Sequence, residues 1–117
     1  MSRILVVDDD SSIVAVVSDI LRAEGHDVVT AENGAVALDK ANGEALVLLD
    51  MRMPVLDGWG FAREFRAAGK RSPIVVMTAA DNARRWAEEI GAEGYLAKPF
   101  EIDALIAAVQ RYATGGR

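Results

Sequence analysis

The sequence predicts an α/β domain in which an open parallel sheet is covered by helices on both faces. Short runs rich in Val, Ile and Leu alternate with longer amphipathic stretches along the whole chain. The run at residues 3–7 (RILVV) is apolar from Ile4 onward, which is typical of a strand buried on both faces. Five such strand–helix units occur within 117 residues, the length of one ordinary domain. Helical connections between successive strands then favour a parallel sheet with helices on either side.

Each expected strand is followed by an expected helix. The first helix can begin at Ser11 or Ser12, either of which can cap it, and it ends at Gly25. Asp57 is expected to cap the third helix, and the fourth is expected to cover residues 81–90. The last helix shows apolar residues at i, i+3, i+4 and i+7. The expected strands cover residues 3–7, 27–31, 45–49, 73–78 and 94–97.

Composition excludes several classes of protein. The chain has no cysteine, so it has no disulfides, thiolate metal sites or cysteine nucleophiles, and His26 is its one histidine. Acidic residues outnumber basic residues 18 to 13, which argues against a basic nucleic-acid surface. No apolar run has the length of a membrane span, and no signal peptide is recognisable. We expect a soluble, cytoplasmic single domain over residues 1–117, with an ordered core of about residues 3–112 and a loose tail at 113–117.

Polar residues follow four of the five expected strands. Asp8 and Asp9 follow the first strand, Asp50 the third, Thr78 ends the fourth and Lys98 follows the fifth. In open parallel sheets, ligands bind at the carboxyl ends of the strands, near the point where the strand order reverses. If the order is 2-1-3-4-5, the first and third strands are neighbours and the three aspartates converge. Thr78 and Lys98 then lie beside them.

Such a cluster has a definite chemistry. Three neighbouring carboxylates repel one another, and a hard divalent cation such as Mg²⁺ relieves that repulsion. A carboxylate held by a cation and a lysine is a suitable nucleophile toward phosphorus, because both positive charges neutralise the transferring group. A threonine hydroxyl can then bind a phosphoryl oxygen. The residues therefore indicate formation of an acyl phosphate on an aspartate.

Four motifs at these strand ends resemble those of the response-regulator receiver domain of two-component signalling. The resemblance covers residues 3 to about 112 and implies a single, chemotaxis-receiver-like domain with a flavodoxin-like fold. It also implies the strand order 2-1-3-4-5, for which chemotaxis receivers are a standard example, and five helices. The motifs are Val6-Val7-Asp8-Asp9, residues 48–54 (LLDMRMP) with Asp57-Gly58, Met77-Thr78-Ala79, and residues 94–100 (GYLAKPF).

The resemblance implies a role for each acidic residue. Asp50 is the residue that would be phosphorylated. Asp9 would bind Mg²⁺ (or Mn²⁺) directly, Asp8 would help through water, and Asp50 would complete the set. The backbone carbonyl of Arg52 would be a further metal ligand, which leaves the side chain of Arg52 unconstrained by that role.

The same resemblance assigns the remaining polar residues. Thr78 and Lys98 would contact the phosphoryl group, and Tyr95 matches the aromatic residue that turns inward when Thr78 moves toward the phosphate. The bond between Lys98 and Pro99 matches a position that is usually cis in the family. The segment from Thr78 to Gly91 is shorter than the family pattern, so either the loop before the fourth helix or the helix itself is expected to be trimmed.

The implied function is phosphorylation-dependent signalling. A histidine kinase or a histidine phosphotransfer protein would phosphorylate Asp50, and the switch would remodel the face made by the fourth helix, fifth strand and fifth helix for a downstream protein. The domain would dephosphorylate itself slowly without being an enzyme for a separate metabolite. We expect a monomer or weak dimer with no direct nucleic-acid binding and no membrane insertion. It would be a stand-alone regulator or part of a larger regulator or hybrid kinase.

Three other functions fit parts of the pattern. In an aspartate-nucleophile phosphohydrolase, Asp8 would be the nucleophile and Asp10 the acid/base, although the chain is short and lacks an obvious cap segment. A degenerate receiver could act as an adaptor that never uses phosphate. A flavin carrier of similar fold is disfavoured because the segment after the first strand is acidic and would repel the cofactor phosphate.

Overall fold

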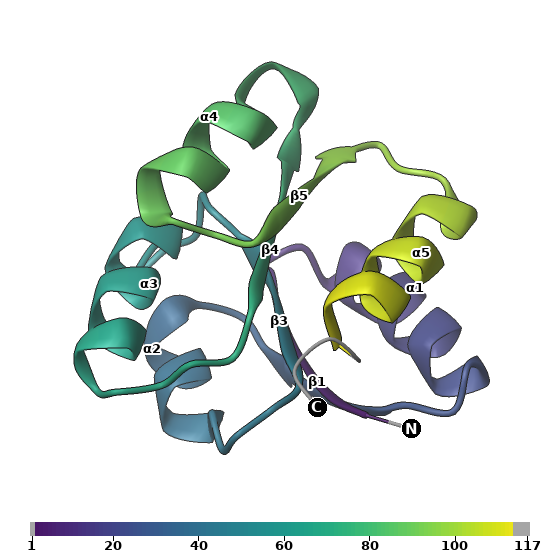
Figure 1. Cartoon of the computed structure of the whole chain (residues 1–117), viewed down its shortest axis with the longest axis horizontal. Coiled ribbons are helices and arrows are strands. Elements are labelled where there is room, and N and C mark those ends of the chain that lie inside the picture. The colour runs from purple at the N-terminus through teal and green to yellow at the C-terminus, as the bar shows by residue number, and fades with distance from the viewer. Residues whose placement is uncertain (1, 114–117) are drawn as a thin grey trace.

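The computed structural model of the protein describes residues 2–113. Five strands alternate with five helices along the chain (Figure 1). The strands are β1 (Arg3–Val7), β2 (Asp27–Ala31), β3 (Leu46–Asp50), β4 (Ile74–Ala79) and β5 (Gly94–Lys98). The helices are α1 (Ser11–Ala23), α2 (Gly34–Lys40), α3 (Gly58–Ala67), α4 (Ala80–Ile90) and α5 (Ile102–Ala113).

The strands form one parallel sheet in the order β2-β1-β3-β4-β5, which confirms the predicted topology. The chain passes from β1 outward to β2, then crosses back to β3 on the other side of β1. The order therefore reverses between β1 and β3. In register, Val7 lies opposite Leu49, and Asp50 lies opposite Met77. The ends of β1, β3 and β4 consequently meet at one edge of the sheet.

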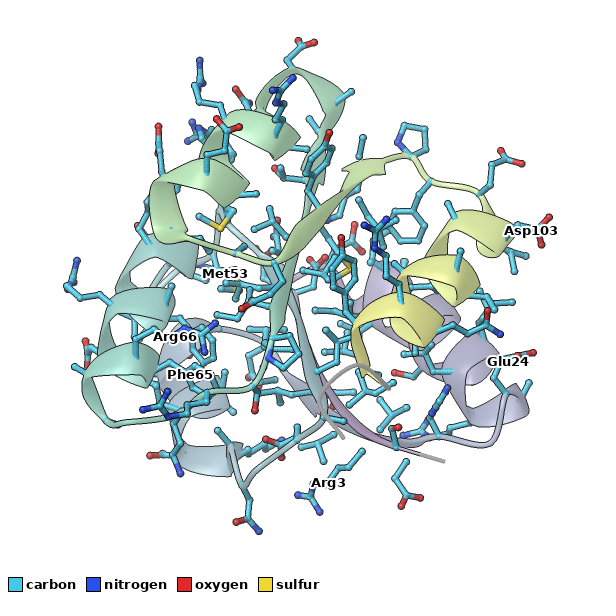
Figure 2. The ribbon with its side chains drawn as sticks, in the orientation of Figure 1. Arg3, Glu24, Met53, Phe65, Arg66 and Asp103 are labelled. Carbon is cyan, nitrogen blue, oxygen red and sulfur yellow. The ribbon has the colours of Figure 1, made fainter. Side chains whose placement is uncertain are left out.

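Two apolar layers hold the helices to the sheet. One face packs against α2, α3 and α4 and includes the buried side chains of Phe61, Phe65 and Trp86. The other face packs against α1 and α5 through Val17, Leu21 and Leu105, among others. Figure 1 shows these helices on opposite sides of the sheet, and Figure 2 shows their side chains filling the space between. Residues 4–7 of β1 and all of β3 are buried, which confirms the prediction that the apolar run of β1 lies inside the sheet with both faces covered.

The first helix begins differently from the prediction. Asp10, and neither Ser11 nor Ser12, caps α1, because its Oδ1 accepts hydrogen bonds from the backbone N–H groups of Ser12 (2.9 Å) and Ile13 (3.3 Å). The predicted cap of α3 is confirmed, since the side chain of Asp57 accepts a hydrogen bond from the Gly60 N–H.

Other boundaries shift by a residue. Asp50 and Lys98 are the last residues of β3 and β5, so the sheet itself fixes their backbones. Ala113, predicted to begin the tail, is the buried last residue of α5, and the rest of that predicted tail (114–117) lies outside the described residues. Among residues 2–113, none of the helices combines the length and apolar character that a membrane span requires.

The connection between β4 and α4 is very short. Strand β4 ends at Ala79 and α4 begins at Ala80, with no loop residue between them. Ala79 occupies the N-cap position and provides no side-chain hydrogen bond. Helix α4 is thus continuous with the strand that carries Thr78.

Candidate functional site

The predicted site residues meet at the carboxyl edge of the sheet. Asp8 follows β1, and its backbone N–H donates to the carbonyl oxygen of Ala31 at 3.1 Å, which continues the β1–β2 pairing. Asp50 ends β3, and Thr78 stands one residue beyond the partner of Asp50 on β4. Asp8, Asp50 and Thr78 are all buried, whereas Asp9 is exposed. The sheet therefore presents a partly buried acidic cluster with one carboxylate open to solvent.

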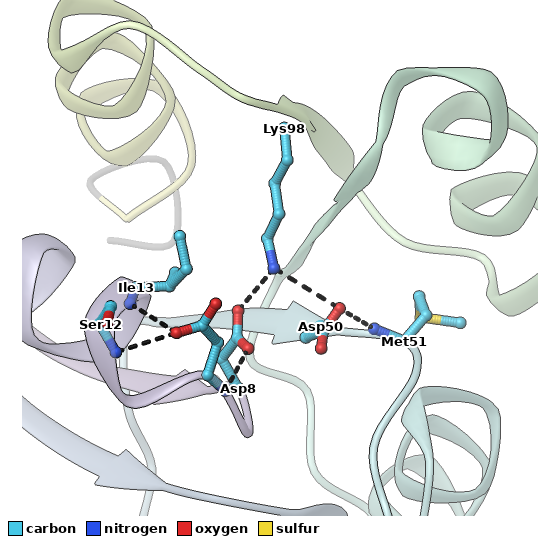
Figure 3. Close-up of polar contacts among 7 residues, drawn as sticks. Asp8, Ser12, Ile13, Asp50, Met51 and Lys98 are labelled. Atoms are coloured by element: carbon cyan, nitrogen blue, oxygen red, sulfur yellow. Dashed lines mark hydrogen bonds and ion pairs between the residues drawn. The ribbon is translucent and has the colours of Figure 1, made fainter.

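Lys98 reaches this cluster from the end of β5. Its Nζ donates to Oδ2 of Asp8 at 2.8 Å and lies 3.8 Å from Oδ1 of Asp50 (Figure 3). The bond between Lys98 and Pro99 is cis, as the family resemblance predicted. The ammonium thus lies between the two buried carboxylates.

Backbone donors hold the two buried carboxylates in place. Oδ1 of Asp8 accepts from the N–H of Asp10 at 2.9 Å, and Oδ1 of Asp50 accepts from the N–H of Met51 at 2.9 Å. These contacts cannot be predicted from the sequence, because a backbone N–H leaves no signal in residue type. The sequence likewise gives no sign of the role of Gly58 beyond its place in a motif. A Cβ built on Gly58 would lie 3.0 Å from the carbonyl oxygen of Asp50 and 2.7 Å from the Cα of Met51, so only glycine fits behind the acidic residue.

The surroundings of Asp50 favour its protonated form. Burial, followed by the negative charge of Asp8, raises the pKa of the Asp50 carboxyl, while Lys98 and the Met51 N–H lower it; the net pKa is about 6. A shift of this sign means that burial and the neighbouring carboxylates outweigh the effect of Lys98, so the Asp50 carboxylate would be stabilised by further positive charge. A divalent cation would supply it.

The donor set matches what a hard cation requires. One carboxylate oxygen from each of Asp8, Asp9 and Asp50 lies within 4.8 Å of the others. Hard divalent cations prefer carboxylate and carbonyl oxygens, and Mg²⁺ commonly keeps several waters besides. Exposed Asp9 leaves the cluster open to solvent on one side. The three aspartates could therefore hold Mg²⁺ or Mn²⁺.

Two predicted residues lie at the margin of the cluster. Thr78 is buried at the end of β4, close in register to Asp50. Tyr95 is 48% exposed on β5, so its ring points outward in this structure. The structure brings Asp8, Asp9, Asp50 and Lys98 together, whereas Tyr95 lies on the outer surface of the β5 edge.

Comparison with known proteins gives the family. Residues 4–110 match the family model described as the response regulator receiver domain. The chain belongs to the response regulator receiver domain family. Receiver domains of this family are signalling phosphoacceptors that bind Mg²⁺ at an acidic pocket, and response regulators are phosphorylated by histidine kinases and act on downstream targets.

Two curated relatives of this receiver domain are transcriptional regulators. The alkaline phosphatase synthesis transcriptional regulatory protein PhoP of Bacillus subtilis is 39% identical over 116 residues, covering 93% of this chain and 48% of PhoP. The transcriptional regulatory protein PrrA of Mycobacterium tuberculosis is 41% identical over 112 residues, covering 92% of this chain and 48% of PrrA. The receiver domain thus spans about half the length of these relatives.

Solved structures share its whole fold. The Francisella response regulator 1452 receiver domain superposes with a TM-score of 0.89 at 29% identity, with 100% of both chains covered. The receiver domain of the sensor histidine kinase PA1611 from Pseudomonas aeruginosa, solved with a magnesium ion in its active site cleft, superposes with a TM-score of 0.87 at 34% identity. That superposition covers 97% of this chain and 98% of the PA1611 domain.

Proposed function

We propose that Asp50 of this receiver domain accepts a phosphoryl group from a histidine kinase or a histidine phosphotransfer protein. The observation that carries the proposal is the convergence of Asp8, Asp9 and Asp50 within 4.8 Å, with the Lys98 ammonium between the two buried carboxylates. An unprotonated oxygen of Asp50 would form the new bond to phosphorus. The bond from phosphorus to the donor imidazole would break, and that nitrogen would keep the electron pair.

The surrounding residues would prepare Asp50 for this step. Asp8, Asp9, Asp50 and the carbonyl of Arg52 would hold Mg²⁺ or Mn²⁺, which supplies positive charge to the phosphoryl oxygens. Lys98 would pair with the phosphoryl group, and Thr78 would donate its hydroxyl hydrogen to another phosphoryl oxygen. The Met51 N–H already holds Oδ1 of Asp50 at 2.9 Å, so the carboxylate is oriented before the donor arrives. The elevated pKa of Asp50, about 6, would fall as positive charge enters the cluster.

The output is proposed to run through Thr78 and Tyr95. Movement of Thr78 toward the phosphoryl group would let the exposed Tyr95 ring turn inward, and the surface of α4, β5 and α5 would change with it. The direct passage from β4 into α4 supports this route, because displacement at Thr78 is transmitted to the helix without an intervening loop. The partner at that surface would be a downstream protein. A cytoplasmic location, a monomeric or weakly dimeric state and slow autodephosphorylation stay predictions.

The phosphohydrolase alternative is disfavoured by the contacts of its two aspartates. Oδ1 of Asp8 accepts from the Asp10 N–H, and Oδ2 accepts from Lys98, so both oxygens are already held. Oδ1 of Asp10 caps α1 through two backbone N–H groups. Asp10 is therefore occupied as a structural residue, whereas a phosphohydrolase would use it as a proton donor.

Intact-protein mass spectrometry after incubation with a small-molecule phosphodonor tests the proposal. The wild type is compared with Asp50→Asn and Asp8→Asn, with Mg²⁺ and with a chelator. We expect one added phosphoryl group in the wild type that depends on Mg²⁺ and is absent from Asp50→Asn. Phosphate retained in Asp50→Asn but lost in Asp8→Asn would instead support the phosphohydrolase, and no gain under any condition would support the adaptor.

A further inference from the structure

The side chain of Arg52 lies over the ring of Trp86 on α4. Arg52 lies in the β3–α3 loop, two residues after Asp50, and its side chain is exposed. Its guanidinium carbon lies 5.1 Å from the centre of the Trp86 ring on α4. A guanidinium at this distance from an indole face is attracted to the ring. None of the ion pairs found among residues 2–113 includes Arg52.

Trp86 is held in place on its other side. The ring is 6% exposed and meets the ring of Trp59 edge to face, with 4.9 Å between centroids and 67° between planes. The Nε1–H of Trp59 donates to Oε1 of Glu89 at 2.8 Å, and Glu89 belongs to the same helix as Trp86. The contacts thus fix the Trp86 ring between α3 and α4 as a rigid platform for Arg52.

The cleft beside Arg52 opens toward the acidic cluster. It has a volume of about 350 Å³, and Arg52 and Asp9 both line it. Asp9 is the exposed member of the carboxylate set. An arginine fork pairs readily with a carboxylate, so a guanidinium released from the ring could bind Asp9 across this cleft. That pair would occupy a cation ligand and cancel one of the negative charges that attract a cation.

We infer that Trp86 is a positioning residue that holds the Arg52 guanidinium away from Asp9, so that the acidic cluster stays open to a divalent cation. The inference rests on the proposed function, because it concerns the same cation. It assigns a purpose to a buried tryptophan on α4 that is not a member of the carboxylate set. It also predicts that loss of the ring weakens cation binding only while the Arg52 guanidinium is present.

Binding of Mn²⁺, followed by the electron paramagnetic resonance signal of the free ion, tests this inference in the full chain. The variants are Trp86→Leu, Arg52→Gln and the double variant. Arg85→Gln is a matched control, since it removes an exposed arginine of α4 that instead contacts Asn82. We expect Trp86→Leu to weaken Mn²⁺ binding about fivefold, the effect of an ion pair near 1 kcal/mol. Arg85→Gln is expected to stay within about twofold of the wild type. The double variant is expected to bind Mn²⁺ within about twofold of Arg52→Gln alone, because no guanidinium is left to pair with Asp9.

Two results would overturn the inference. One is Mn²⁺ binding by Trp86→Leu equal to that of the wild type, and the other is a double variant as weak as Trp86→Leu alone. Trp86→Phe keeps a smaller aromatic ring and provides a second test in case Trp86→Leu does not fold. Its Mn²⁺ affinity is expected to lie between those of Trp86→Leu and the wild type. If the wild type does not bind Mn²⁺, the proposed cation site is overturned as well. If the wild type binds Mn²⁺ and the variants bind it equally well, only this inference is overturned.

Discussion

Lys98 is a closer partner of Asp8 than of Asp50: its Nζ lies 2.8 Å from Oδ2 of Asp8 and 3.8 Å from Oδ1 of Asp50. The side chain of Asp8 is completely buried, so this lysine is the main charge that compensates it. Removing one partner of a buried pair leaves the other charge uncompensated, which costs more than the pair itself contributes.

We therefore predict that Lys98→Gln lowers the free energy of unfolding at pH 7 by about 2 kcal/mol in the presence of a chelator, because the charge on Asp8 loses its partner. The pKa of Asp50 is expected to rise further, since Lys98 lowers it in the wild type. Urea denaturation measures the first effect and a carboxyl-carbon NMR titration the second. Arg84→Gln, which breaks an exposed pair with Glu88, is the control and should cost less than about 0.5 kcal/mol. Equal losses in the two variants would contradict the prediction.

The raised pKa of Asp50 makes stability depend on pH. The carboxyl titrates near 3.8 when unfolded and about 6 when folded, so between these values the folded chain binds more protons. The stability contributed by protonated Asp50 is therefore fully present below the pKa of the unfolded chain. It is lost as the pH rises through the pKa of the folded chain.

Asp50→Asn keeps a neutral side chain at every pH and removes this dependence. We expect the variant to be more stable than the wild type by on the order of 2 kcal/mol at pH 7 with chelator, and to lose that advantage below pH 4. Thermal or urea unfolding across pH 3 to 8 measures it. Asp39→Asn, at an exposed position on α2, should shift stability by less than about 0.5 kcal/mol at any pH. A constant difference between Asp50→Asn and the wild type would refute the assignment.

The fold and most of the acidic cluster could be predicted from residue types, because burial and strand direction constrain which residues can occur at these positions. The runs of β1 and β3 are apolar because both of their faces are buried, and that requirement is visible without coordinates. Asp50 and Lys98 could be found because parallel strands bring their carboxyl ends to one edge. The cap of α1 could not be chosen in this way, since Asp10, Ser11 and Ser12 are all good caps and only the backbone angles select among them.

The choice of cap leads to a direct prediction. Asp10→Ala removes the acceptor for the N–H groups of Ser12 and Ile13, and we expect it to lower the free energy of unfolding by about 1 kcal/mol. Asp10→Ser retains a capping oxygen and should recover most of the loss. Ser11→Ala should have little effect, because Ser11 is already within the first turn. Denaturant unfolding of the three variants measures these effects. A larger loss of unfolding free energy in Ser11→Ala than in Asp10→Ala would show that Ser11 caps the helix.

Two glycines of α3 show what residue type could not reveal. Gly60 lies in a helix, where glycine is less favourable than alanine, and the sequence offers no reason for it. In the structure, a Cβ there would meet the Cδ1 of Leu56, the far end of a flexible side chain. At Gly58 the obstacles include the Cα of Met51 at 2.7 Å and the carbonyl oxygen of Asp50 at 3.0 Å, which are backbone atoms. The two positions look alike in sequence but differ in how easily their neighbours can move.

We predict that Gly58→Ala lowers the free energy of unfolding by about 3 kcal/mol, because the backbone that carries Asp50 must shift. Gly60→Ala should change it by less than about 1 kcal/mol, since Leu56 can change rotamer and alanine favours the helix. Gly58→Ala should also slow phosphorylation of Asp50 at temperatures where the variant is still folded, as followed by intact mass. Gly60→Ala, with the same added methyl two residues away, is the matched control. Normal phosphorylation in a folded but destabilised Gly58→Ala would show that Gly58 serves packing alone and does not position the acceptor.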